Sequence, residues 1–375
     1  MTRRHRQHAR RVRYPEFCAR PIRDYSTSPG KMKNLGPDFK SVLWLNRFAW
    51  FTAFATLLLI CSGGMVTSKG VGLAVPDWPT TFGYNMFLFP ASKWIGGIFF
   101  EHTHRLIAST VGLLTIILAT WLWLADPRRW VRMLGLAAVG AVILQGVLGG
   151  LRVTMLKDEI GIFHACLAQA FFGLIVIIAL VTSQSWRAVT VVADHGKSLR
   201  VIALATTALI YLQLALGATM RHQHRDLAIT DFPTAYGRWI PDTSAAAIPK
   251  INAARDTIAM SDVSAAQIWL QMAHRFGALL VALGVIWFFF SAHREKIPPQ
   301  RGLSTAWLIG VLLQITLGAW TIWSNKAADV ATTHVAVGAT MLGLGAVICA
   351  FCFRQNETPS AFSPSRRIKS DPVIA

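Results

Sequence analysis

Four histidines lie inside long apolar stretches of this sequence, and their type and spacing are the strongest indication of chemistry in the chain. They are His104, His164, His274 and His334. An ionisable side chain is costly in such surroundings and therefore needs a partner or a ligand. Two helices that each present one imidazole can clamp a planar metal macrocycle from opposite faces, which is bis-histidine haem ligation. The alternative for each histidine is a hydrogen bond to a neighbouring helix.

The histidines fall in two matching sets, which favours two haem sites, one in each half of the chain. No Asp or Glu accompanies the histidines of the second half, which disfavours a di-iron carboxylate site. Zinc would require a tighter, tetrahedral cluster of ligands. Haem is therefore the metal group that this pattern best predicts.

The two halves differ beside the first histidine of each pair. Glu101 lies three residues before His104 and thus on the same helix face, whereas Gln271 precedes His274 at the matching position. A buried, desolvated Glu101 would be a candidate acid/base or radical-stabilising group. Its alternative is a salt bridge to Arg105 or to lysines of the outer loop. The difference predicts a division of labour between the two sites.

An arginine directly follows the first histidine of each pair. Arg105 and Arg275 are suited to pairing with haem propionates, and bidentate contact is open to a guanidinium. A lipid headgroup is the alternative partner for both. We expect the two arginines to contribute to the haem sites of their own halves.

Three other histidines receive no role in these sites. His102 lies about 200° around the helix from His104 at about 100° per residue, so we expect it at the rim. His222 and His224 follow the fifth apolar stretch, and we expect both to be solvated in a loop.

Composition predicts the helices that must position the four histidines. Of 375 residues, 53% are hydrophobic and 15% charged, and the mean hydropathy of +0.44 lies outside the usual balance of a soluble domain. A helix needs about 20 apolar residues to cross the hydrocarbon core. We therefore expect an all-α integral membrane protein with eight transmembrane helices, at about 44–67, 95–124, 131–151, 160–185, 200–220, 266–291, 303–324 and 331–353.

The net charge of +19 does not indicate nucleic-acid binding, because the basic residues lie in the tails and in the loops between apolar spans. Basic clusters follow the second, fourth and sixth spans, which places those loops and both termini in the cytoplasm. We expect an N-in, C-in protein of the lipid bilayer, in the bacterial inner membrane rather than the mitochondrial inner membrane. The clusters are Arg128, Arg129 and Arg132, then Arg187, Lys197 and Arg200, then Arg294, Lys296 and Arg301.

An internal repeat organises the chain. The segment AVPDWPTTFGY, which begins at residue 74, matches AITDFPTAYGR, which begins at residue 228. Each half spans four helices, so both halves have the same orientation and each is predicted to form a four-helix bundle. The two Pro-containing loops are predicted to be outer turns, and their repetition suggests that they cover the mouth of a site.

Within the repeat, a Gln lies four residues before a Gly in the third and seventh spans, at Gln145 and Gly149 and at Gln314 and Gly318. This spacing favours close helix packing. A CxxC in the last span is expected to supply small core residues, and no cysteine pair lies in the outer loops.

We expect four segments: a basic cytoplasmic tail at 1–43, an N-terminal bundle at 44–186, a C-terminal bundle at 187–353 and a flexible tail at 354–375. The first segment contains no apolar signal-peptide region. A translation start at Met32 is an alternative for this end of the chain.

These features resemble the haem A synthase family (COX15-CtaA type). The resemblance extends over about residues 44–353. It is carried by the loop VTSKG…DWPTTFG, by the signature E-x-x-H-R at Glu101-His102-Thr103-His104-Arg105, and by His164, His274 and His334 on alternating spans. Some bacterial members carry a cysteine pair in outer loops, and this chain has none there.

The resemblance implies that haem O is the substrate and that its C8 methyl group is oxidised by successive hydroxylations to a formyl group, giving haem A for cytochrome oxidase. It implies that haem O binds the first bundle near Glu101, His104 and His164, and that haem b is an electron-transfer cofactor on His274 and His334. A haem O synthase and a second copy of the chain are candidate partners, and the sequence identifies no electron acceptor.

Two other functions use paired histidines. A dihaem b-type membrane cytochrome would only pass electrons and would not need Glu101. A haem-binding transporter or assembly module would release its haem unmodified. A chemically altered haem recovered from the protein would distinguish an enzyme from both.

Overall fold

The computed structural model describes residues 37–188, 197–222, 227–295 and 299–354. The described residues from Ser41 onward form one compact unit, to which the following description applies. Within the described ranges, eight helices are long and apolar enough to cross a membrane, as predicted. They are α1 (Pro37–Ser68), α2 (Gly96–Ala125), α3 (Arg129–Met155), α4 (Asp158–Thr182), α6 (Lys197–His222), α8 (Ala265–Glu295), α9 (Gln300–Trp323) and α10 (Ala328–Phe353).

Several of these helices continue past the apolar runs that predict them, because a helix can extend into the headgroup region without leaving its backbone groups unpaired. α8 is an example, ending at Glu295 rather than near residue 291. Two helices outside the spans were not predicted: α5 (Gln184–Ala188) and α7 (Ala247–Asp256). The cytoplasmic tail expected at 1–43 lies outside the described residues up to residue 36, as do residues 355–375 of the expected C-terminal tail.

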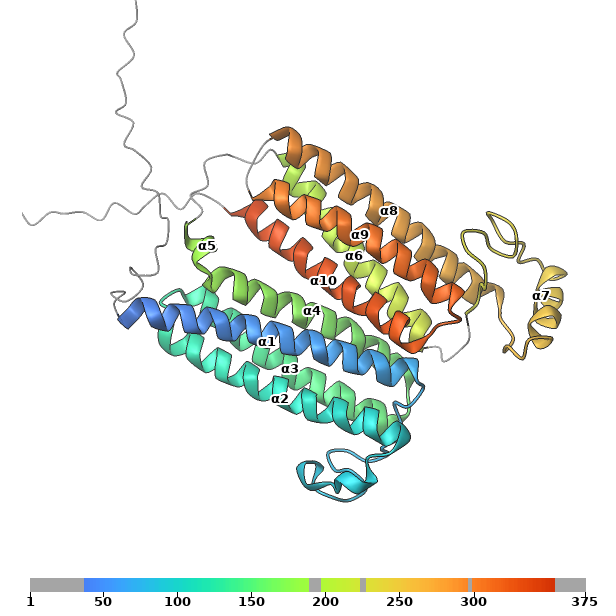
Figure 1. The fold of residues 1–375 in the computed structure, drawn as a ribbon, viewed down its shortest axis with the longest axis horizontal. Coiled ribbons are helices and arrows are strands. Elements are labelled where there is room, and N and C mark those ends of the chain that lie inside the picture. The colour runs from blue at the N-terminus through green and yellow to red at the C-terminus, as the bar shows by residue number, and fades with distance from the viewer. Residues whose placement is uncertain (1–36, 189–196, 223–226, 296–298, 355–375) are drawn as a thin grey trace, which may run out of the picture. The chain divides into compact units, whose positions relative to one another are not determined.

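The spans gather in two groups of four (Figure 1), with α1 to α4 in one and α6, α8, α9 and α10 in the other. α4 contacts both α6 and α10, so these three helices join the groups. Small residues allow this close approach: a Cβ added to Gly343 of α10 would lie 3.1 Å from the Phe172 ring of α4. α4 and α10 are accordingly the spans most buried inside the protein, whereas the other spans offer more of their surface to lipid.

The two Pro-containing loops fold alike. Oδ1 of Asp77 accepts a hydrogen bond from the Phe82 amide at 2.7 Å, and Oδ2 accepts from the Thr80 hydroxyl at 2.5 Å and the Gly83 amide at 2.9 Å. The residue before each loop glycine has a positive φ, 49° at Phe82 and 53° in the second half at Tyr236. The aspartate therefore closes a tight turn, as the loop composition predicts.

Asp231 makes the matching bonds in the second loop, to the Tyr236 amide at 2.7 Å, the Thr234 hydroxyl at 2.7 Å and the Gly237 amide at 3.0 Å. Burial alone would raise the pKa of Asp231, but these hydrogen bonds outweigh it and hold the pKa below its usual value. The same balance lowers the pKa of Asp77. Both loops are therefore tied by an ionised carboxylate at neutral pH.

Candidate functional site

The four histidines lie on the even-numbered spans of the repeat and form two pairs. His104 of α2 and His164 of α4 lie on the first four spans, and His274 of α8 and His334 of α10 lie on the last four. Each pair therefore belongs to a single half of the chain. The structure thus brings together the residues that the sequence places at matching positions.

Each imidazole lies against a glycine of a neighbouring span. An added Cβ would lie 3.0 Å from Cε1 of His104 at Gly63, and 3.4 Å from Cε1 of His164 at Gly149. The second half repeats this arrangement, with 3.3 Å between Gly217 and His274 and 3.2 Å between Gly318 and His334. Contacts under 3.4 Å require the neighbour to move, so a methyl group would press on most of these rings. The glycines leave the space that lets the imidazoles lie between helices.

Glutamines hold the histidine backbones. The amide of Gln145 donates to the carbonyl of His164 at 3.1 Å, and that of Gln314 donates to the carbonyl of His334 at 2.9 Å. A third, Gln213, donates to the carbonyl of His274 at 2.7 Å. Sequence reasoning missed Gln213, although it lies four residues before Gly217 just as the other two lie before their glycines.

The residue at the matching position before Gly63 is Leu59, which carries no amide donor. Three of the four histidines thus have both a glycine and a glutamine on the adjacent span, whereas His104 has only the glycine. The first histidine of the N-terminal half is therefore the least restrained of the four.

The histidines fit a haem group. Nδ1 of each of the four is enclosed and has no hydrogen-bond partner among the described residues. Buried polar atoms are normally hydrogen-bonded, so four imidazole nitrogens without a partner at repeat-related places favour a ligand-binding role over a packing role. Within the described ranges the histidines do not join larger groups of His, Cys, Asp or Glu. Two imidazoles per site are the number that a six-coordinate haem iron requires.

Glu101 is buried, with 4% of its surface exposed. Its Oε1 accepts from the Arg105 guanidinium at 2.9 Å, which confirms the salt bridge weighed from the sequence. Its Oε2 accepts from the amide of Val75 at 2.9 Å, and Arg105 also donates to the carbonyl of Val75 at 2.8 Å. The carboxylate and the guanidinium together therefore bind both backbone groups of one loop residue.

Gln271 performs this task alone in the second half. Its Oε1 accepts from the amide of Ile229 at 2.9 Å, and its Nε2 donates to the carbonyl of Ile229 at 3.1 Å. Ile229 occupies the loop position that Val75 holds in the first half. Tying the loop to the helix therefore does not require a carboxylate; in the first half the carboxylate also pairs with the Arg105 guanidinium.

Both arginines of the His-Arg pairs hold the loops. Arg105 donates to the carbonyls of Asp77 at 2.7 Å and Thr80 at 3.0 Å. Arg275 donates to the carbonyls of Asp231 at 2.6 Å and Thr234 at 2.8 Å. These bonds occupy the terminal nitrogens of both guanidinium groups, and their pairing with haem propionates stays a prediction.

The expected positions of two other histidines are wrong. His102 is fully buried rather than at the rim, because the outer loop folds back and packs Phe89 and Trp94 against its ring at centroid distances of 5.1 and 4.7 Å. His222 is also buried, because α6 continues through it and Gly161 of α4 leaves space for its ring. His224 lies outside the described residues.

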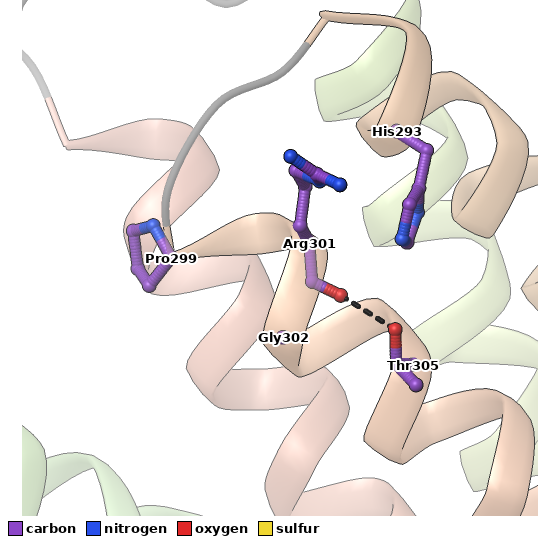
Figure 2. Close-up of a pocket in the computed structure, with 5 residues that line it drawn as sticks. All are labelled: His293, Pro299, Arg301, Gly302 and Thr305. Carbon is purple, nitrogen blue, oxygen red and sulfur yellow. Dashed lines mark hydrogen bonds between the residues drawn. The ribbon is translucent and has the colours of Figure 1, made fainter.

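A surface hollow lies at the far ends of α8 and α9 (Figure 2), lined by His293, Pro299, Arg301, Gly302 and Thr305. The hydroxyl of Thr305 donates to the carbonyl of Arg301 at 2.9 Å within it. His293 lies about 28 Å along α8 from His274 at about 1.5 Å per residue. The hollow is therefore separate from the histidine sites.

Fold and site together define a polytopic membrane protein with two histidine pairs suited to holding haem. A family model described as Cytochrome oxidase assembly protein (COX15-CtaA) matches residues 90–346. The chain belongs to this family.

Three relatives are named Heme A synthase. That of Lysinibacillus sphaericus (strain C3-41) is 25% identical over 312 residues, covering 80% of this chain and 93% of the relative. That of Shouchella clausii (strain KSM-K16) is 28% identical over 255 residues, with coverages of 65% and 75%. The relative from Shewanella oneidensis is 26% identical over 321 residues, with coverages of 80% and 93%.

Proposed function

We propose that this chain has haem A synthase activity and oxidises the C8 methyl group of haem O, by successive hydroxylations, to the formyl group of haem A. Family membership supports the reaction, and the two histidine pairs supply sites for the haems. The observation that carries the assignment of an enzyme is the buried carboxylate of Glu101, which the second half replaces with the neutral Gln271. Gln271 performs the same loop-binding task without it.

In this proposal the N-terminal bundle, residues 44–186, is the substrate half. His104 and His164 hold haem O, and the glycines beside them let the rings turn toward it. Arg105 and the amide of Val75 fix the Glu101 carboxylate by two hydrogen bonds, which leaves further lone pairs to accept and return a proton during oxidation. Burial excludes water from this carboxylate and strengthens its electrostatic effect.

The C-terminal bundle, residues 187–353, is the cofactor half. His274 and His334 hold haem b, which supplies electron transfer when bound. Gln213 and Gln314 fix the backbones of these two histidines, so both ligands are held by a hydrogen bond and a glycine contact. A neutral Gln271 beside His274 keeps a reactive carboxylate away from the permanent haem.

The eight apolar helices make the chain an integral membrane protein. The basic loops support an N-in, C-in orientation in a bacterial cell membrane, which places both histidine pairs in the outer half of the bilayer. Because haem O is the substrate in this proposal, a haem O synthase is the proposed partner that supplies it. A second copy of this chain is a further proposed partner.

The test is extraction and mass-resolved chromatography of the haems that copurify with the full chain expressed beside a haem O synthase. We expect haem A or its hydroxylated intermediate with the wild-type chain, and haem O with haem b in Glu101→Gln. Recovery of unmodified haem b alone from the wild-type chain would identify an electron-transfer cytochrome instead. Unmodified haem O released in stoichiometric amount would identify a haem carrier.

A further inference from the structure

Arg221 is a cation at the outer end of α6 whose partners among the described residues are all neutral. Its guanidinium donates to the carbonyl of Gly64 and the hydroxyl of Ser68, both on α1, and to the carbonyl of Ala331 at 3.4 Å. None of the ion pairs found among the described residues includes it. A partly buried cation without an anion is costly, so this position favours an anionic ligand.

The second histidine pair lies beside this cation. Arg221 follows Gly217, the glycine that contacts the His274 ring, by about one helical turn. Arg221 also donates to the carbonyl of Ala331, which lies three residues before His334 on α10. The charge is therefore within reach of both ligands of the proposed haem b site, on the outer side of the bundle.

The repeat shows that the bundle does not need an arginine here. The matching residue of the first half is Thr67, whose hydroxyl bonds only within its own helix, to the carbonyl of Gly63 at 3.0 Å. The first half carries an additional arginine at a different place. This is Arg152, on α3, three residues after Gly149. Thr321 occupies that place in the second half, and its hydroxyl bonds within α9 at 2.9 Å.

Arg152 has the same relation to the first histidine pair. An added Cβ at Gly161, three residues before His164 on α4, would lie 3.1 Å from the Nε of Arg152. An added Cβ at Gly72, in the outer loop, would lie 2.8 Å from its guanidinium. Each half thus carries one arginine near its own pair of histidines, Arg152 at the end of α3 and Arg221 at the end of α6. The two arginines do not occupy matching positions of the repeat.

We propose that Arg221 binds a carboxylate group of the haem held by His274 and His334, and that Arg152 does the same for the haem held by His104 and His164. This inference rests on the proposed haem sites. Arg105 and Arg275 already hold the loops, and their own pairing with propionates stays a separate prediction. The chemistry is that of a guanidinium with a carboxylate, which forms short charge-assisted hydrogen bonds.

The experiment compares iron protoporphyrin IX with its dimethyl ester, which lacks ionised carboxylates. Both are titrated into the full-length chain in detergent, carrying His104→Ala so that only the second site reports. We expect the free acid to bind about 10-fold or more tightly than the ester. Arg221→Thr, which installs the residue of the first half, should remove this preference. In the complementary background of His274→Ala, Arg152→Thr should remove the preference of the first site.

Arg221→Gln is the control for a folding defect, because the glutamine amide can still donate to the Gly64 carbonyl and the Ser68 hydroxyl on α1. We expect Arg221→Gln also to lose the preference and to lower the midpoint potential of the bound haem, because a nearby cation favours the reduced, less positive form. Arg221→Lys should restore the potential toward that of the wild-type chain.

A retained preference for the free acid and an unchanged midpoint potential in Arg221→Thr and Arg221→Gln would overturn the inference and leave Arg221 as a tie between α6 and α1. Failure of the His104→Ala chain to bind either porphyrin would instead refute the haem b site, and with it the proposed function.

Discussion

The two halves of the chain repeat one frame and differ in the side chains around it. In both, an outer loop closes on an aspartate, an arginine after the first histidine holds that loop, and each imidazole contacts a glycine. Among the matching residues that differ are Glu101 and Gln271, Leu59 and Gln213, Thr67 and Arg221, and Arg152 and Thr321. We therefore expect the frame to define where haem binds, and these differences to decide what each site does with it.

The second half holds its histidines more firmly. His274 has a glutamine on its carbonyl at 2.7 Å, whereas Leu59 leaves the backbone of His104 without that bond. A cofactor that stays bound benefits from fixed ligands, because ligand orientation sets the properties of the metal. A substrate that must enter and leave benefits from a less restrained ligand. The difference agrees with a substrate site in the first half and a cofactor site in the second.

The outer coverings of the halves differ as well. In the first, Phe89 and Trp94 pack on the buried His102. In the second, the longer connection contains α7 and forms an apolar cluster that includes Ile229 and Ile268. Different segments therefore pack beside the same type of loop turn in the two halves.

The largest expected effect comes from removing one ligand of one pair. His274→Ala should lose haem b almost completely, whereas His104→Ala should keep haem b and lose haem O and haem A, because each pair serves its own half. Pyridine haemochrome spectra and chromatography of the extracted haems measure both. Normal haem b content in His274→Ala would refute the assignment of the cofactor site.

Exchanging the residues that distinguish the halves should have the next largest effect. Glu101→Gln can reproduce the bonds that Gln271 makes to its loop, so we expect normal folding and haem content with haem A formation lowered about 100-fold or more. Gln271→Glu is the matched control and should leave turnover far less affected. Unchanged haem A formation in Glu101→Gln would remove Glu101 from the mechanism.

A smaller effect is expected from the glutamine. Gln213→Leu makes the second half resemble the first and removes the hydrogen bond to the His274 carbonyl, at a cost of about 1 kcal/mol. Haem b should dissociate several-fold faster when apomyoglobin is added as an acceptor. The reciprocal Leu59→Gln should slow release of haem from the first site. Equal dissociation rates in the wild-type chain and Gln213→Leu would show that the amide does not restrain the ligand.

The smallest effect concerns the outer loops. The pKa values of Asp77 and Asp231 are lowered in the folded protein, so their stabilising contribution is complete above the ordinary aspartate pKa and is lost as the pH falls through the folded value. Limited proteolysis should therefore cut both loops faster in acid. Asp77→Asn and Asp231→Asn should raise cleavage at neutral pH and weaken this acid dependence; a wild-type acid response in both variants would assign the response to other groups.

Much of this protein is determined by local sequence. Eight apolar runs predict the eight spans because lipid admits few alternatives to a helix of about 20 residues. The four histidines and the difference between Glu101 and Gln271 follow from comparing the two halves, since a repeat places matching residues in matching surroundings. The loop turns are predictable because Asp, Pro and Gly act on residues close to them in the chain.

Contacts between distant segments required the tertiary structure. The glycine beside each histidine, the bond from Gln213 to His274, and the burial of His102 and His222 all depend on which helix faces lie together. The arginines illustrate the limit most clearly: Arg105 and Arg275 adjoin the histidines in sequence but hold the loops, whereas Arg221 reaches α1 from the other half of the chain. Sequence periodicity gives the direction of a side chain on its own helix, but the packing of helices determines which group it meets there.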